Sequence, residues 1–227
     1  MTSEEFVLAN TRPGRAPLVP ELLLHLADEV TPLWQATEAW LARVNVAPPY
    51  WAFAWPGGQA LARLVLDEPA RVRGRRILDF AAGCGVAALA CARAGAAAVE
   101  AAELDPLAAA AIGLNAALNG AAPNGAAPNG ATLAVRLGDL VGEMGPWDLI
   151  LCGDVCYEAP MTRHILPWLR RLAATAEVLV ADPGRAYLPG EGLELLARYD
   201  VPTSLDLEDR PVRTTAVYRL LPGAAPA

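Results

Sequence analysis

The stretch Ile77–Gly85, Ile-Leu-Asp-Phe-Ala-Ala-Gly-Cys-Gly, constrains this chain more than any other. The apolar residues of Arg76–Phe80 suit a short strand, and the alanine-rich segment Val86–Ala94 suits a helix. Two glycines between them, Gly83 and Gly85, allow the backbone to bend and to approach a ligand closely. Because the amides at a helix N-terminus point to the same place, the strand, turn and helix together predict a nucleotide-type binding site.

Two kinds of ligand fit this turn. The segment Gly83–Ala88 matches the dinucleotide fingerprint G-x-G-x-x-G/A, and Glu103 follows it by about 20 residues, as that fingerprint requires. Asp79, however, ends the strand just before the turn, where a carboxylate repels a pyrophosphate and attracts an ammonium group. The methionine end of S-adenosylmethionine carries such an ammonium. Asp79 therefore favours a methyl donor, and an ordinary strand–helix turn without a ligand is the remaining alternative.

Length and charge narrow the class of protein. The 227 residues are enough for one α/β domain with a sizeable core. The net charge is −7 and no basic block is present, so we expect no nucleic-acid partner and a better fit to a basic protein surface. The acidic segment Met1–Asn10 does not resemble a signal peptide. The uncharged segment Pro106–Val135 is interrupted by Asn, Gly and Pro, which argues against a membrane helix and a membrane partner.

The spacing of cysteine and histidine predicts that the chain has no metal site. None of the four cysteines stands in a C-x-x-C pair, and the two histidines are far apart in the sequence. We expect free thiols in a reducing, cytoplasmic setting for Cys84, Cys91, Cys152 and Cys156.

The chain divides into three parts: an N-terminal extension over residues 1–48, a main domain over 49–221 and a disordered tail over 222–227. The extension is expected to begin with a flexible lead-in over Met1–Val19. A strand over Pro20–Ala27 and a helix that starts at Thr31, with threonine as N-cap and proline next, are expected to follow.

The main domain alternates strands and helices and ends in two strands. After the first strand, strands are predicted at Ala97–Glu103, Thr132–Leu137, Trp147–Cys152, Glu177–Ala181, Val201–Leu207 and Thr214–Leu221. Helices are predicted at Gly58–Leu66, from Pro106 to about Asn119, at Ala159–Ala174 with a break at Pro167, and at Gly190–Tyr199. This order fits a seven-stranded sheet of the methyltransferase type.

Polar side chains follow the ends of several strands, where ligands bind in an open parallel sheet. Glu103 stands at a strand tip, where its carboxylate can accept both ribose hydroxyls of a nucleoside. Asp139 either accepts from an adenine amine or is a plain surface residue. Asp154 and Tyr157 face the site if the register holds, and otherwise they are a helix cap and a core aromatic. Asp105 is expected only to cap a helix.

Two further stretches are unusual in composition. The aromatic-rich stretch Ala47–Gln59 is either a hydrophobic staple onto the core or a lid over a ligand, and the residues alone do not decide between these. The five-residue unit repeated within Asn119–Gly130 is too short and too rich in Gly and Pro for a solenoid. We interpret it as a flexible loop expansion without function.

Several motifs carry a resemblance to a known family. The glycine turn is generic, whereas three motifs are more specific: Trp55–Gln59 (Trp-Pro-Gly-Gly-Gln), Gly153–Tyr157 (Gly-Asp-x-x-Tyr) and Asp182–Arg185 (Asp-Pro-Gly-Arg). With the surrounding stretches they span about Ala47 to Arg185. The chain resembles class I S-adenosylmethionine-dependent methyltransferases, and more narrowly the electron transfer flavoprotein beta subunit lysine methyltransferases.

The resemblance implies a Rossmann-like α/β fold, in which a seven-stranded sheet with an antiparallel seventh strand carries helices on both faces. It implies S-adenosylmethionine as the cofactor and lysines of a protein, the electron transfer flavoprotein beta subunit, as the substrate. It places Asp154 and Tyr157 at the target amine as catalytic residues. It assigns donor contacts to Trp55, Pro56, Gly57, Asp79, Ala81, Gly83, Gly85, Glu103, Leu104, Asp139 and Leu140.

Ala81 departs from the family pattern, which has glycine at this first position of the turn. Alanine fits if its φ is negative, whereas a positive φ would strain the turn and weaken donor binding.

Other functions remain open on the sequence. A methyltransferase for a ribosomal protein or a small-molecule amine would share the donor half. An NAD-dependent oxidoreductase would use the same glycine turn, although Asp79 and the lack of a Tyr-x-x-x-Lys motif argue against it. A non-catalytic donor-binding scaffold is the third alternative.

Overall fold

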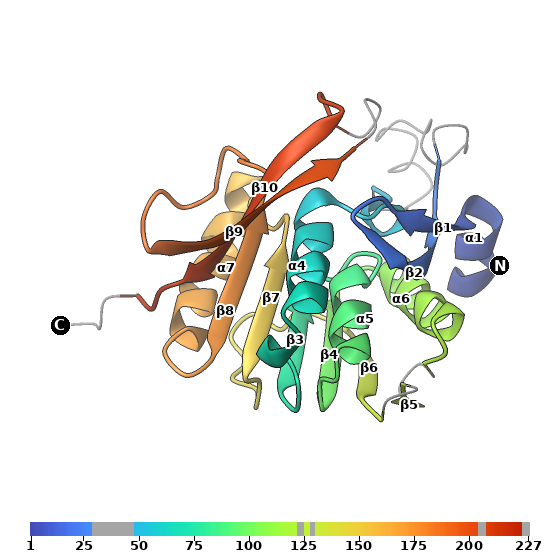
Figure 1. Cartoon of the computed structure of the whole chain (residues 1–227), viewed down its shortest axis with the longest axis horizontal. Coiled ribbons are helices and arrows are strands. Elements are labelled where there is room, and N and C mark those ends of the chain that lie inside the picture. Colours follow the sequence, from blue (N-terminus) through green and yellow to red (C-terminus); the bar gives the residue numbers. More distant parts are fainter. Residues whose placement is uncertain (29–47, 122–124, 128–129, 204–207, 224–227) are drawn as a thin grey trace.

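The computed structural model describes residues 1–28, 48–121, 125–127, 130–203 and 208–223. In this part of the chain the main sheet has the strand order β5-β6-β4-β3-β7-β8-β10-β9 (Figure 1). Its strands are β3 (Arg76–Phe80), β4 (Ala98–Glu103), β5 (Gly125–Ala126), β6 (Thr132–Leu137), β7 (Leu149–Gly153), β8 (Glu177–Asp182), β9 (Leu193–Pro202) and β10 (Val212–Leu220).

The pairing within this sheet follows the expected pattern. The five central strands, β6, β4, β3, β7 and β8, are parallel to one another. The last strand, β10, is antiparallel to both of its neighbours, β8 and β9. Apart from the two-residue β5, the sheet has seven strands, and this confirms the predicted Rossmann-like arrangement with an antiparallel final strand.

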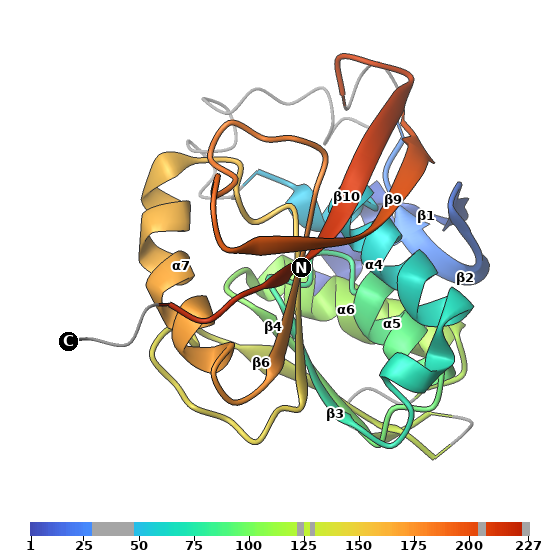
Figure 2. The same ribbon diagram turned by 60° about the vertical axis from the view of Figure 1, so that its left-hand side comes forward.

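The central strands are apolar on both faces, which is why helices cover both sides of the sheet. Ile77 and Leu149 face one core, and their neighbours Leu78 and Ile150 face the other. Figure 2 shows the helices α4 (Pro56–Asp67), α5 (Val86–Arg93) and α6 (Pro106–Leu118) on one side and α7 (Ala159–Leu172) on the other.

Local signals explain where these helices begin. The Asp105 carboxylate accepts a hydrogen bond from the Leu107 amide at 2.8 Å, and Pro106 takes the first helical position, as predicted for α6. α4 likewise has a proline, Pro56, at its first position, but its N-cap residue Trp55 makes no side-chain cap. The break predicted at Pro167 is absent from the described helix, because α7 runs through this residue to Leu172.

The flexible lead-in predicted for Met1–Val19 is wrong. Residues Ser3–Asn10 form α1, whose N-terminus is closed by a capping box between Thr2 and Glu5. The strand β1 (Arg12–Ala16) then pairs with β2 (Val19–Leu26), the strand that was expected. The polar composition concealed α1, which is held by tertiary packing against α6.

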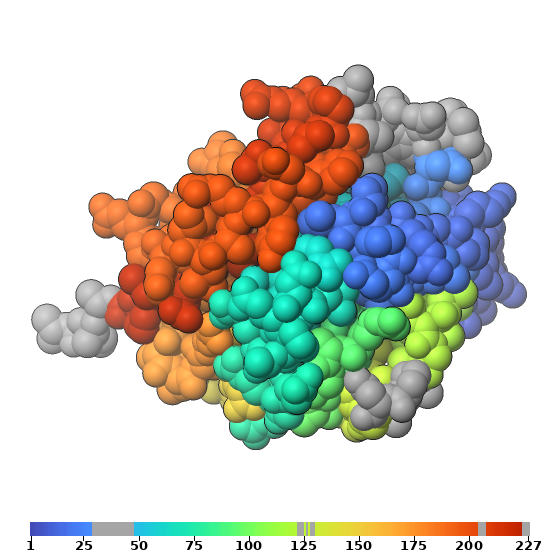
Figure 3. All heavy atoms as spheres, viewed as in Figure 1, coloured from blue at the N-terminus to red at the C-terminus, as the bar shows by residue number. Residues whose placement is uncertain are grey.

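The N-terminal hairpin is tied to α6 by side-chain amides. The Asn115 side chain accepts from the His25 amide at 2.6 Å and donates to the Cys84 carbonyl at 2.8 Å. It thereby links β2 to the glycine turn. Figure 3 shows the N-terminal residues, in blue, packed beside the surfaces of α4 and of α5 and α6.

The helix predicted over Gly190–Tyr199 is also wrong, because its residues from Leu193 onward belong to β9. β9 pairs with β10 from Leu193 to Pro202. A register shift between Val217 and Tyr218 interrupts the alternation of side chains along this pair, which concealed the strand pattern.

Two other expectations fall partly or wholly on residues that the structure does not describe. The helix predicted to start at Thr31 lies outside the described residues. Of the repeat within Asn119–Gly130, the described Gly125–Ala126 pair with β6. No helix in the described residues has both the length and the apolar character needed to cross a membrane.

Candidate active site

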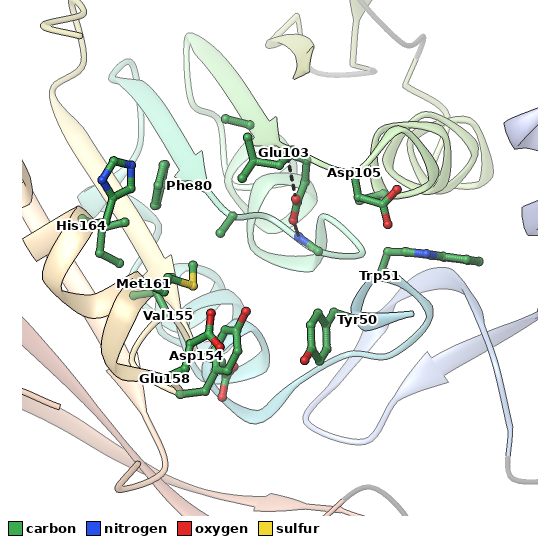
Figure 4. Close-up of a pocket in the computed structure, with 18 of the residues that line it drawn as sticks. Tyr50, Trp51, Phe80, Glu103, Asp105, Asp154, Val155, Glu158, Met161 and His164 are labelled. Carbon is green, nitrogen blue, oxygen red and sulfur yellow. Dashed lines mark hydrogen bonds between the residues drawn. The ribbon is translucent and has the colours of Figure 1, made fainter. Parts of the chain in front are cut away.

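A cavity of about 740 Å³ opens at the carboxyl ends of the parallel strands. This volume lies within the usual range for small-molecule sites. Its wall is built from residues that follow β3, β4, β6, β7 and β8 in turn, together with the segment just before α4. Figure 4 shows Glu103 on one side of this cavity and Asp154 on the opposite side.

The glycine turn forms one wall of the cavity and holds Glu103 in place. The Gly83 amide donates to Glu103 Oε1 at 2.6 Å, and the Leu104 amide donates to Oε2 at 3.0 Å (Figure 4 shows the first of these). Burial raises the pKa of Glu103, and these two amides oppose that shift. The carboxylate is therefore fixed at the cavity wall, where it can accept further hydrogen bonds.

Ala81 and Gly83 line the cavity in left-handed conformations, with φ values of 55° and 57°. Glycine adopts this region freely, whereas alanine is strained there. The φ of Ala81 is therefore positive, which is the case in which strain in the turn is expected to weaken donor binding.

Gly85 serves packing rather than the cavity wall. A Cβ atom at Gly85 would lie 3.1 Å from the Ile112 side chain on α6, and the residue has a φ of 77°. The glycine therefore allows α5 and α6 to approach closely, and Gly85 is absent from the cavity lining.

Asp79 does not line the cavity, although a donor contact was predicted for it. It is buried below the turn, and its Oδ2 accepts from the Ala88 amide in α5 at 2.8 Å. Burial raises the pKa of this carboxyl to about 8, and the charge of Glu103 adds to the shift. The first turn of α5 attracts the side chain away from the cavity, because the amides of that turn need acceptors.

Three further predicted donor contacts, Leu104, Asp139 and Leu140, divide between cavity and core. Leu104 and Asp139 line the cavity, and Leu104 is 68% exposed. Leu140 is buried in the core instead. Asp139 Oδ2 lies 3.3 Å from His164 Nε2 on α7, and His164 also lines the cavity. His164 was not predicted as a site residue, because no sequence motif connects it with residues so far away in the chain.

Asp154 is held by the start of α4. It follows β7 with a φ of 57°, and its Oδ2 accepts from the amides of Gly57 at 2.6 Å and Gly58 at 3.2 Å. A Cβ at Gly57 would lie 2.5 Å from that same oxygen. Pro56 and Gly57 were predicted to contact the donor, but they are buried and absent from the cavity lining. The Gly57 amide, together with that of Gly58, instead holds the Asp154 carboxylate.

The second oxygen of Asp154 has unused hydrogen-bonding capacity. Among the described residues Oδ1 has no hydrogen-bond partner although it is buried, and Arg185 Nη2 lies 3.6 Å from it. Burial raises the pKa of Asp154 to about 7; Arg185 lowers it and Asp182 raises it. A buried acceptor of this kind favours a ligand that brings a hydrogen-bond donor.

Aromatic rings form the rim beside Asp154. The ring centroid of Tyr50 lies 5.6 Å from that of Tyr157 and 6.1 Å from that of Trp55. Burial raises the pKa of Tyr157 to about 12, so its phenol is neutral at pH 7. Trp55 and Tyr50 line the cavity, whereas the neighbouring Phe53 packs into the core. In the described part of Ala47–Gln59, some aromatic residues therefore pack onto the core while others line the cavity.

Comparisons with known proteins agree with this architecture. The magnesium protoporphyrin IX methyltransferase ChlM from Synechocystis PCC 6803, solved with bound SAM, shares the fold with a TM-score of 0.51 and 16% identity. That likeness covers 72% of this chain and 79% of ChlM. The model of the family described as ribosomal protein L11 methyltransferase (PrmA) matches residues 60–152.

Curated relatives match nearly the whole chain. The electron transfer flavoprotein beta subunit lysine methyltransferase of Xenopus laevis is 38% identical over 96% of this chain and 86% of its own length. The Danio rerio protein of the same name is 35% identical over 95% and 82%, and that of Homo sapiens is 34% identical over 90% and 76%. This chain belongs to the family of electron transfer flavoprotein beta subunit lysine methyltransferases.

Proposed function

We propose that this protein transfers methyl groups from S-adenosylmethionine to lysine side chains of the electron transfer flavoprotein beta subunit. The observation that carries the proposal is the pair of carboxylates on opposite sides of one cavity, Glu103 and Asp154. One is suited to ribose hydroxyls, and the other keeps a buried oxygen free for an amine. Membership of the family supports methyl transfer to lysines of this beta subunit, which the name of the relatives states.

The residues of the cavity fit the donor. Glu103 offers a fixed carboxylate to the ribose, and Leu104 and Asp139 line the end proposed for the base. Trp55 and Gly83 also line this cavity. When bound, the donor supplies a methyl group on a positively charged sulfur, so the protein mainly orients the amine and excludes water.

The lysine must lose its proton before it can accept the methyl group. At pH 7 this costs about 4–5 kcal/mol, from a reference pKa of about 10.4. Asp154 Oδ1 is placed to receive the amine and to orient its lone pair. Because burial raises the pKa of Asp154 to about 7, this carboxylate is also a suitable proton acceptor. Tyr157 and Tyr50 give the methylated amine an aromatic surface.

The first experiment is a calorimetric titration of the purified protein with S-adenosylmethionine, its demethylated product and NAD. We expect micromolar binding of the first two compounds and none of NAD. The protein is then incubated with donor and intact electron transfer flavoprotein, and the modified lysines are mapped by mass spectrometry. The proposal would be contradicted if the protein bound NAD and not S-adenosylmethionine. It would also be contradicted if the protein bound the donor but left the beta subunit unmodified.

A ribosomal protein is the second candidate substrate, because the family model that matches residues 60–152 is described by ribosomal protein L11. That segment holds the glycine turn and Glu103, which belong to the proposed donor half. The same assay with ribosomal protein L11 and with small amines separates the candidates. The net charge of −7 favours a basic protein surface over nucleic acid as the partner.

A further inference from the structure

Arg185 stands on the cavity wall beside Asp154. It follows β8, and the loop that carries it is shaped by Asp182, whose Oδ1 accepts from the amides of Gly184 at 2.7 Å and Arg185 at 2.6 Å. This turn directs the guanidinium towards Asp154, with Nη2 at 3.6 Å from Oδ1. That separation is too long for a hydrogen bond but short enough for a strong Coulombic interaction.

Glu208 holds the other side of the guanidinium. It comes from the connection between β9 and β10, and its side chain is only 3% exposed. Both terminal nitrogens of Arg185 donate to it, Nη2 to Oε1 at 2.5 Å and Nη1 to Oε2 at 3.3 Å. Arg213 donates to the same carboxylate from Nε at 3.1 Å. The forked end of Arg185 is therefore committed to Glu208 rather than to Asp154.

This arrangement leaves the buried Asp154 Oδ1 without a hydrogen-bond donor among the described residues. Among the described residues, three buried side-chain atoms without a hydrogen-bond partner belong to this cluster: Asp154 Oδ1, Asp182 Oδ2 and Arg185 Nε. A freed guanidinium would satisfy Oδ1 through a charge-assisted hydrogen bond, because such bonds are strong where water is excluded. Glu208 is the contact that prevents this.

We propose that Arg185 and Glu208 are positioning residues for the lysine site. Glu208 keeps the guanidinium beside Asp154 but off its Oδ1, so that the carboxylate stays charged and open to the substrate amine. The inference rests on the proposed function and deepens it. It assigns roles to residues that do not themselves touch the amine.

The charged and titratable groups around Asp154 determine its pKa. Arg185 and Asp182 face it from the end of β8, with Glu208 behind Arg185. Its own loop contributes Cys156, Tyr157 and Glu158, Tyr50 stands across the rim, and α4 contributes only the amides of Gly57 and Gly58. Among these groups, Arg185 is the one positive charge in the described residues.

The first test is the pH profile of kcat/KM for Arg185→Gln. Because Arg185 lowers the pKa of Asp154, its removal should move the acidic limb to higher pH by about one unit or more. Donor affinity, measured by calorimetry, should stay within about twofold. A limb that remains at the wild-type position would overturn the proposal. If the Gln variant does not bind donor, Arg185→Lys decides, since it keeps the charge and should keep the limb in place.

The second test separates the two residues. Glu208→Gln should release Arg185 onto Asp154 and raise the KM for the protein substrate by roughly tenfold, with donor affinity unchanged. In the double variant Arg185→Gln/Glu208→Gln the guanidinium that faced Oδ1 is gone, so KM should return towards wild type while the acidic limb stays shifted. A Glu208→Gln enzyme with wild-type KM, or a double variant with a KM as high as that of Glu208→Gln, would contradict the proposal.

The matched control is Arg76→Gln. Arg76 is paired with Asp148 at the opposite ends of the strands, so this change removes an ion pair without touching the cavity. Its pH limb and KM should equal those of the wild type. Failure of the proposed function would appear separately, as a wild-type protein that binds donor and methylates no lysine.

Discussion

At the scale of single residues, the candidate site includes two non-glycine residues whose backbone has a positive φ, a conformation that such residues rarely adopt. Ala81 and Asp154 both have φ values near +55°, and both line the same cavity. Such strain is retained where the surrounding structure imposes it, and it is found most often at functional sites. For Asp154, the strained backbone brings its carboxylate against the amides of α4.

Asp154→Asn tests the role of this charge. Asparagine tolerates a positive φ better than alanine does, and its side-chain oxygen can still accept from the Gly57 amide. We expect kcat/KM for lysine methylation to fall by at least about 100-fold. Asp154→Ala should also abolish transfer. Calorimetry should give a donor affinity within about twofold of wild type for the Asn variant; a collapse of donor binding would identify Asp154 as a cofactor residue instead.

Ala81→Gly tests the strain in the turn. The left-handed conformation costs alanine about 1 kcal/mol or more, and glycine avoids this cost. After allowance for the greater freedom of glycine in the unfolded chain, we expect Tm to rise by roughly 1–3 °C. S-adenosylmethionine should bind more tightly, because the turn no longer has to be forced into this shape. A lower Tm together with weaker donor binding would show that the Ala81 methyl group makes contacts worth more than the strain.

At the scale of elements, the site is an assembly of strand ends against the start of α4. Gly57 and Gly58 on α4 lie so close to β7 and β8 that backbone meets backbone. A Cβ at Gly153 would likewise lie 2.7 Å from the Gly58 amide nitrogen. The Trp-Pro-Gly-Gly motif therefore sets the distance between helix and sheet.

Gly57→Ala should disrupt this junction. The new methyl group would meet Asp154 Oδ2 at 2.5 Å and the Ala181 carbonyl oxygen at 2.6 Å. We expect a loss of about 1–3 kcal/mol in the free energy of unfolding and a loss of methylation, because Asp154 is displaced. Gly190→Ala is the control, since no atom of the described residues lies within 4 Å of the added Cβ. Denaturant unfolding and the methylation assay give the two readouts; a Gly57 variant that matches the control in both would contradict this account.

At the scale of the whole molecule, a buried carboxylate makes the free energy of unfolding depend on pH. Asp79 is buried between β3 and α5, and burial raises its pKa to about 8, well above the value of about 3.9 in an unfolded chain. Its protonated form therefore favours the folded state. This contribution is full below about pH 4 and is lost as the pH rises through about 8.

Asp79→Asn removes this dependence, because asparagine stays neutral and can still accept from the Ala88 amide. We expect the variant to be more stable than wild type at pH 8–9, and the difference in Tm to shrink steadily as the pH is lowered towards 5. Thermal melts across this range provide the measurement. Two melting curves that stay parallel over the whole range would show that Asp79 does not titrate in this way.

Much of the fold could be predicted because it depends on local patterns. The strand Arg76–Phe80, the glycine turn and the Asp105 cap all have signals within a few residues, and all three are found as predicted. β9 and α1 were predicted wrongly for the opposite reason. Pairing with β10 and packing on α6 decide these two segments, and both contacts are remote in sequence.

The candidate site follows the same division. The sequence by itself determined that acidic residues end the parallel strands and that glycines interrupt the chain beside them, because residue type and spacing are local properties. Only the tertiary structure decided which way these side chains turn. Asp79 faces α5, Gly57 seats Asp154, and Glu208 holds Arg185. Each of these contacts joins segments that meet only after the sheet has assembled, so its energy depends on positions that no short stretch of sequence contains.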